Sequence, residues 1–143
     1  MLRSERGQSL VELALVMPLL ILLLTGIADL GRAFYSYIQI TNAAREGARA
    51  ASRLSCYSGT SAVDITQREV YADRIRTAVG DEVDDAIVLR DEDIVIDPVP
   101  EDECQMPGLP IEVTVSYLYE TILVGNFTMS SSAAMSRIAP PAP

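Results

Sequence analysis

The sequence contains no histidine, no lysine and no tryptophan, and only two of its 143 residues are cysteine. Histidine is the commonest general acid–base group and the commonest metal ligand. A serine nucleophile without histidine would need lysine as its base, and lysine is also absent. No pair of carboxylates stands out as suited to glycoside hydrolysis. We therefore expect that the protein is not an enzyme and that it binds no cofactor and no metal.

Positive charge is scarce and unevenly placed in this chain, whose formal net charge is −9. Residues 1–53 carry a net charge of +2, and residues 54–143 carry −11. The acidic part would be repelled by phosphate, which argues against nucleic acid as a partner and fits a water-exposed lobe. The acids between Asp81 and Asp97 lack EF-hand spacing, so we interpret them as a solvated acidic face and not a Ca²⁺ site.

One long apolar run dominates the N-terminal part of the chain. The sixteen residues from Leu13 to Ala28 include no charge, and if Leu10 and Leu30 are counted, the segment reaches the length of a transmembrane helix, about 17–25 residues. Its Leu, Ile and Val residues favour insertion by about 3–5 kcal/mol. Glu12 lies near one end of the run, where a charge costs less than at the bilayer centre.

A short basic leader, residues 1–7, precedes the run. Its two arginines favour a cytoplasmic N-terminus with the C-terminal part outside. If the chain is cut after Gly7, Gln8 becomes a new N-terminal amine about one helical turn from Glu12. That amine, on the same helix or on a neighbouring one, would neutralise the acid and fix the axial register of a helix bundle.

The residues at this point resemble a known family. Gly7-Gln8-Ser9-Leu10-Val11-Glu12 resembles a type IV prepilin cleavage site, in which a small residue is followed at the fifth position by Glu. The stretch from Arg6 to Ser52, about a third of the chain, resembles the TadE-like pseudopilins of tight-adherence (Tad/Flp) type IV pilus systems. The matching pieces are Val-Glu before the run, Pro18, Asp29-x-Gly31-Arg32 and Asn42-Ala43-Ala44-Arg45-Glu46-Gly47-Ala48-Arg49.

The resemblance implies a minor pseudopilin, a structural subunit of pilus assembly, with roles in cell adhesion or secretion. A prepilin peptidase would cut between Gly7, a small residue suited to its cleft, and Gln8, whose amine pairs with Glu12 during assembly. The implied partners are other pilins and pseudopilins, the prepilin peptidase and an inner-membrane assembly platform. The protein would cross the cytoplasmic (inner) membrane once, N-in and C-out, and would be part of an extracellular pilus after assembly.

Two other interpretations stay open. A secretory signal peptide would be cut after Gly26-Ile27-Ala28, but Glu12 and the apolar periodicity beyond that site count against it. The second is an uncleaved single-pass membrane protein with an extracytoplasmic lobe that binds a partner.

The two cysteines, Cys56 and Cys104, are too few for a metal site without histidine. In an exported lobe they would form one disulfide, worth about 4 kcal/mol in the chain-entropy account. The alternative is two free thiols.

The patterns predict an α+β fold of pilin type, in which a long N-terminal helix packs on a small antiparallel sheet of about four strands. Residues 8–53 form the transmembrane and spine helix, with bends or local melting at Pro18, Gly26 and Gly31. Its apolar face comprises Ile27, Leu30, Phe34, Tyr37, Thr41, Ala44, Ala48 and Ala51. Residues 54–143 form the extracytoplasmic acidic lobe. Within it we expect a helix over 64–79, ended by Gly80, and strands over 86–90, 94–97, 111–119 and 127–138.

Overall fold

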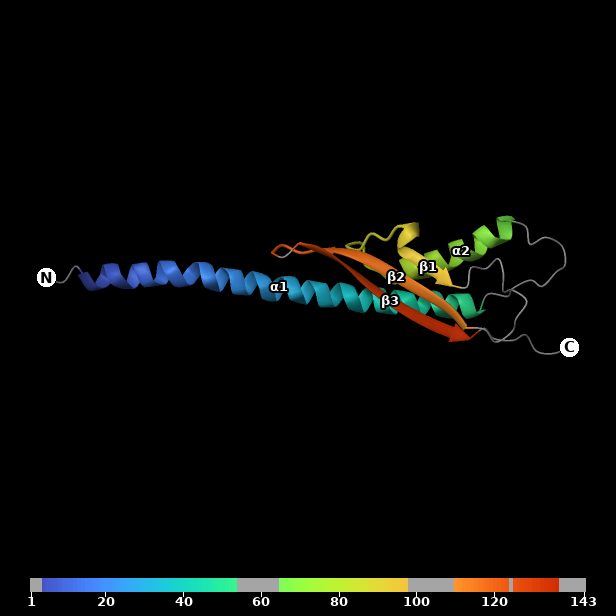
Figure 1. Cartoon of the computed structure of the whole chain (residues 1–143), viewed down its shortest axis with the longest axis horizontal. Coiled ribbons are helices and arrows are strands. Elements are labelled where there is room, and N and C mark those ends of the chain that lie inside the picture. Colours follow the sequence, from blue (N-terminus) through green and yellow to red (C-terminus); the bar gives the residue numbers. More distant parts are fainter. Residues whose placement is uncertain (1–3, 54–64, 98–109, 124, 137–143) are drawn as a thin grey trace.

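The computed structural model describes residues 4–53, 65–97, 110–123 and 125–136. A long helix and a small antiparallel sheet dominate it, which confirms the predicted α+β arrangement (Figure 1). In chain order the elements are α1 (Ser4–Arg53), α2 (Ile65–Gly80), the 3₁₀ turn η1 (Asp91–Asp93), β1 (Ile94–Asp97), β2 (Pro110–Glu120) and β3 (Asn126–Ser136).

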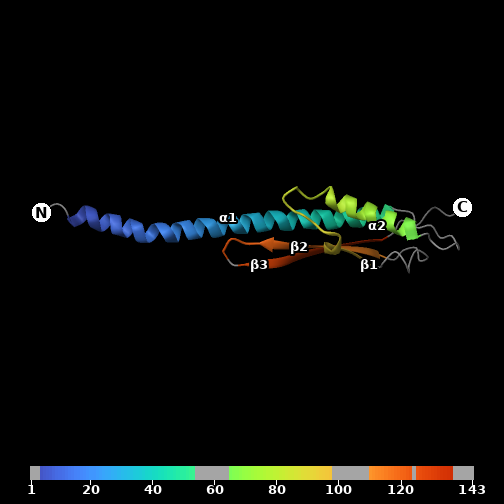
Figure 2. The same cartoon turned by 90° about the horizontal axis from the view of Figure 1, so that it is seen from above.

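Helix α1 is a single element of 50 residues whose first half stands alone, while the lobe packs along its second half (Figures 1 and 2). It begins at Ser4, within the predicted leader. The helix is continuous through Pro18, Gly26 and Gly31, so of the predicted bends or local melting the melting is wrong, and Figure 1 shows the helix gently curved. An apolar helix tolerates one missing backbone donor when the turns on both sides keep their own hydrogen bonds.

The described strands form one antiparallel sheet in the order β1-β2-β3. Val113 of β2 lies opposite Ile96 of β1 and Ala133 of β3. The strand predicted over 111–119 is confirmed, and its side chains alternate: Ile111, Val113, Val115 and Tyr119 are buried while Glu112 and Glu120 are exposed.

The predicted strand over 86–90 is wrong, and three described strands replace the expected four. The backbone turns there instead, since the N–H of Ile87 donates to the carbonyl of Asp84 at 2.8 Å. Ile87 is buried, but its neighbour Val88 points into solvent. A β-branched run this short therefore supplies one core side chain without pairing to the sheet.

The hydrophobic core lies where α2 and the inner face of the sheet both pack against the second half of α1. Gly47 is at the tightest point: a Cβ there would lie 2.6 Å from Cγ2 of Val79 on α2 and 3.1 Å from Cγ1 of Val113 on β2. Small side chains thus bring the lobe close to the helix. The core residues are Ile40, Ala43, Ala44, Ala48, Ala51, Ile75, Val79, Ile94, Ile111, Val113 and Val115.

The predicted apolar face of α1 is right only near the end of the helix. Ala44, Ala48 and Ala51 are buried, but four earlier members of that face are exposed, namely Ile27, Leu30, Phe34 and Tyr37. The lobe instead covers a neighbouring face of α1, on which Asp29, Ser36 and Ile40 are buried. The helix has apolar residues on both faces at this level, and periodicity alone does not tell which of them the lobe covers.

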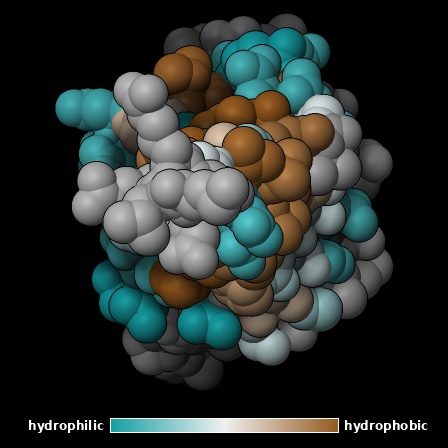
Figure 3. All heavy atoms as spheres, turned by 90° about the vertical axis from the view of Figure 1, so that its left-hand side faces the viewer, coloured by the Kyte–Doolittle hydropathy of each residue, from teal (hydrophilic) through white to brown (hydrophobic). Residues whose placement is uncertain are grey.

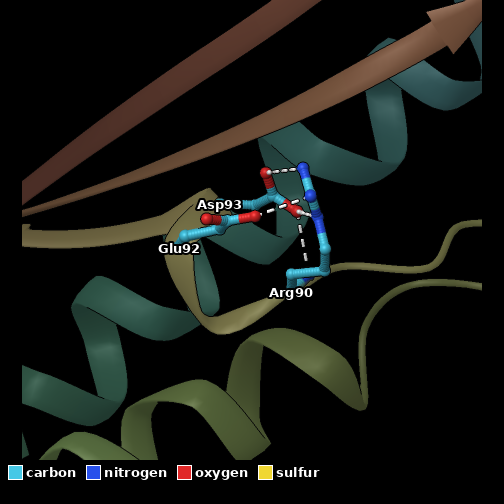
Figure 4. Close-up of polar contacts among 3 residues, drawn as sticks. All are labelled: Arg90, Glu92 and Asp93. Carbon is cyan, nitrogen blue, oxygen red and sulfur yellow. Dashed lines mark hydrogen bonds and ion pairs between the residues drawn. The ribbon is translucent and has the colours of Figure 1, made fainter.

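A charged turn leads into β1 and is held by Arg90 (Figure 4). The guanidinium Nε and Nη2 donate to the Asp93 carboxylate at 3.2 and 3.3 Å, and Nη1 lies 2.6 Å from Oε1 of Glu92. Burial alone would raise the pKa of Asp93, but hydrogen bonds from the Arg90 backbone and side chain outweigh it and lower that pKa. Part of the predicted acidic face is therefore neutralised internally. The described ranges contain no group of acidic, His or Cys side chains arranged to hold a metal ion.

Candidate functional site

The uncovered half of α1, residues 7–24, is the most unusual surface of the molecule. Every residue in it is exposed, and Leu15 leaves 75% of its surface open. In the view from the N-terminal end, hydrophobic residues gather on the side of the molecule that faces the viewer (Figure 3). Within the described residues one helix is long and apolar enough to cross a membrane, by length and composition. The chain is thus compatible with a single-pass membrane protein.

The three predicted processing and assembly residues lie on the first turns of this half of α1. Gly7, Gln8 and Glu12 are all exposed, and a Cβ at Gly7 would meet no other atom within 4 Å. Gln8 and Glu12 are four positions apart and therefore on the same side of the helix. The side-chain carboxylate of Glu12 makes no hydrogen bond or ion pair with any residue that the structure describes. The geometry brings these residues together, and their roles stay predictions.

The predicted disulfide residues, Cys56 and Cys104, lie outside the described residues. Their pairing therefore stays a prediction.

A second site lies where α1 meets the tip of the β2–β3 hairpin, which we define by its described residues 121–123 and 125. The carboxylate of Asp29 accepts a hydrogen bond from the backbone N–H of Ile122 at 3.1 Å. The hydroxyl of Tyr119 lies 3.0 Å from the Asp29 carbonyl oxygen and 3.2 Å from its Oδ1, and shares its proton between them. Asp29 is only 7% exposed. We call these three residues the Asp29 clasp.

Packing and burial hold Tyr119 in its place in the Asp29 clasp. Tyr119 is the last core-facing residue of β2, and its ring packs against Phe127 with centroids 5.5 Å apart. Burial raises the pKa of the Tyr119 phenol, the hydrogen bond and charge of Asp29 raise it further, and Arg32 opposes them. The hairpin thus supplies two donors to a carboxylate on the helix, which fixes the hairpin tip beside α1.

Sequence reasoning placed Asp29 in a motif without giving it a role. Two features of the sequence could have indicated the clasp. One is an acid at the end of an apolar helix, and the other is a tyrosine at a core-facing strand position. Each needs a polar partner when it is buried. Asp29 and Tyr119 are 90 positions apart in the sequence, so the sequence alone did not show that they pair with each other.

This geometry defines a class of protein: an α+β chain whose long apolar helix is uncovered at one end and fixed to a small antiparallel lobe at the other. The family comparison is more specific. Residues 7–49 match the family model described as TadE-like protein, which confirms the resemblance over that segment. The match includes the uncovered half of α1 and Asp29, and it stops before the sheet. No curated protein and no solved structure matches the chain.

Proposed function

We propose that the protein is a minor pseudopilin, a structural subunit of Tad pilus assembly. A prepilin peptidase cuts it between Gly7 and Gln8, and the uncovered half of α1 then packs into a bundle with other pilins. The observation that carries this proposal is the uncovered half itself, an apolar surface with one acid near its start that has no partner among the described residues. Such a surface contacts lipid before assembly and neighbouring apolar helices after assembly.

The start of the helix supports the proposed charge pairing. Before cleavage Glu12 has no described partner. Cleavage places a positive amine at Gln8, one turn away on the same side of the helix. In a bundle that amine also comes within reach of the Glu12 of a neighbouring subunit, so one charge pair offsets the burial of both groups.

The exposed face of α1 beyond the apolar run supports packing against other helices. Leu30, Phe34 and Ile38 follow one another at intervals of four, and all three are exposed. At 1.5 Å per residue, Ile38 lies about 12 Å past Leu30 and beyond the reach of the acyl chains. A neighbouring helix covers such a residue where lipid does not.

The alternative function is an uncleaved membrane anchor whose lobe binds a partner. Photo-crosslinking in pilus-forming cells separates the two, because Leu15 on α1 and Val88 on the lobe are almost equally exposed, at 75% and 77%. A crosslinking residue at Leu15 should capture other pilins, and one at Val88 should not. Capture from Val88 alone would contradict the pilin proposal and favour the anchor.

A further inference from the structure

The tip of the β2–β3 hairpin lies beside the apolar part of α1, at some distance from the rest of the core. Both views show the turn pointing toward the uncovered half of the helix (Figures 1 and 2). Two contacts fix its level. The Ile122 N–H is bonded to Asp29, and the nearest atom to a Cβ built at Gly26 is Cδ1 of Leu123, at 3.8 Å.

The tip presents apolar side chains outward. Ile122 is 63% exposed and Leu123 is 46% exposed, and Phe127 at the start of β3 is also open. A lobe that met only water would gain nothing from three large apolar residues at one turn.

Two polar groups of the tip have hydrogen-bond partners within the protein. The hydroxyl of Thr121 donates to the Gly125 carbonyl at 2.6 Å, and the Ile122 N–H donates to Asp29. Gly125 has a φ of 102°, a left-handed value that side chains other than glycine rarely adopt, and it closes the turn. These two bonds lower the cost of moving the Thr121 hydroxyl and the Ile122 N–H out of water.

The level of the tip falls inside the predicted membrane segment. That segment ends near Leu30, and Gly26 lies four residues before it, or about 6 Å at 1.5 Å per residue. Apolar groups of interfacial elements lie about 5–10 Å into the boundary between headgroups and acyl chains. Along α1 the first uncovered charge on this side is Arg32, since Asp29 is buried in the clasp, and on the hairpin the exposed Glu120 lies two residues before Ile122.

We infer that, before assembly, the β2–β3 hairpin tip enters the outer leaflet of the membrane, where Ile122 and Leu123 contact lipid acyl chains beside α1. This inference rests on the membrane placement of α1 in the proposed function. The occupant is lipid and not a second protein, because the tip continues the lipid-facing surface of the helix at the same level. The lobe is then held at a fixed depth and tilt by two elements.

Single-tryptophan variants test the inference, because the chain has no tryptophan of its own. The full chain is reconstituted in phosphatidylcholine vesicles, with acyl chains brominated at shallow or deep positions as fluorescence quenchers. Ile122→Trp reports on the tip, and Leu123→Trp repeats the test if the first variant misfolds. Ile21→Trp reports on the helix, and Val95→Trp on the exposed face of β1 is the matched lobe control.

The expected result is loss of Ile122→Trp fluorescence with shallow bromines, loss of Ile21→Trp fluorescence with deep ones, and no loss for Val95→Trp. If Ile21→Trp is quenched while Ile122→Trp matches Val95→Trp and is open to aqueous iodide, the inference is overturned and the proposed function stands. If Ile122→Trp is shielded from both lipid bromine and iodide, a protein covers the tip, which also overturns the inference. Absence of quenching at Ile21→Trp overturns the membrane placement and the inference with it.

Discussion

The carboxylate of Asp29 on α1 accepts a hydrogen bond from the backbone N–H of Ile122, 93 residues away in the sequence. This contact joins the end of the apolar helix segment to the tip of the hairpin. Tyr119 adds a second donor to the same carboxylate. The lobe is therefore fixed to the helix at two levels, by the core around Gly47 and by the Asp29 clasp.

Asp29→Ala should release the hairpin tip while the core stays folded. Loss of hydrogen bonds to a charged acceptor costs about 1.5–3 kcal/mol. We expect the Ile122 amide to exchange its hydrogen about 10–200-fold faster, by the relation between free energy and equilibrium constant. Amide hydrogen exchange of the detergent-solubilised full chain measures this. Asp85→Ala, at an exposed acid of the lobe, is the control, and an unchanged Ile122 amide in Asp29→Ala would refute the clasp.

Tyr119→Phe should change how stability depends on alkaline pH. The pKa of Tyr119 is raised in the folded state, so the stability that it contributes is complete below about pH 10, the unfolded value. That contribution is lost as the pH rises from 10 through the folded pKa. Tyr119→Phe should therefore be less stable than the wild type at pH 8, and the difference should shrink above pH 10. Chemical denaturation followed by circular dichroism measures both, with Tyr117→Phe as the control. A difference that stays constant to pH 11 would count against the buried phenol.

Gly47→Ala should destabilise the lobe. The new Cβ would lie 2.6 Å from Cγ2 of Val79, and valine is too stiff at χ1 to move aside freely. Overpacking costs about 1–3 kcal/mol, and the higher helix propensity of alanine returns up to about 1 kcal/mol. Gly31→Ala is the matched control, because a Cβ there meets no atom within 4 Å and the variant should be neutral or stabilising. Equal denaturation midpoints for the two variants would contradict the close packing at Gly47.

The elements of this fold were predictable where one periodicity dominates a long segment. The uninterrupted apolar run gave α1, and the alternation of Ile111, Val113 and Val115 gave β2. The predicted strand over 86–90 is absent because Ile87 closes a turn that starts at Asp84, and Val88 follows in irregular backbone outside the sheet, although both residues are β-branched. The β-propensity of a single residue does not by itself make a strand. A segment becomes a strand only where the edge of another strand is close enough to form hydrogen bonds with it.

The sites were less predictable than the elements. Gly7, Gln8 and Glu12 are close in sequence, and the spacing of four alone placed Gln8 and Glu12 on one side of a helix. The Asp29 clasp joins residues from α1 and the β2–β3 hairpin, and only the folded lobe brings them together. For the same reason the sequence did not tell which apolar face of α1 the lobe would cover.

Glu12→Gln should leave membrane insertion intact and impair pilus assembly. The amide removes the charge that the amine at Gln8 is proposed to pair with, and it makes the helix easier to insert. Membrane fractionation measures insertion, and the amount of sheared pilus material measures assembly. Glu112→Gln on the exposed face of β2 is the control. Normal assembly of Glu12→Gln would remove the charge-pair account.

We propose that peptidase cleavage creates the ammonium that neutralises Glu12. The intact mass of the protein extracted from membranes of pilus-forming cells tests it most directly. The account predicts a mature chain that begins at Gln8, and the full-length chain in cells that lack the peptidase. A chain that keeps residues 1–7 in assembled pili would contradict it.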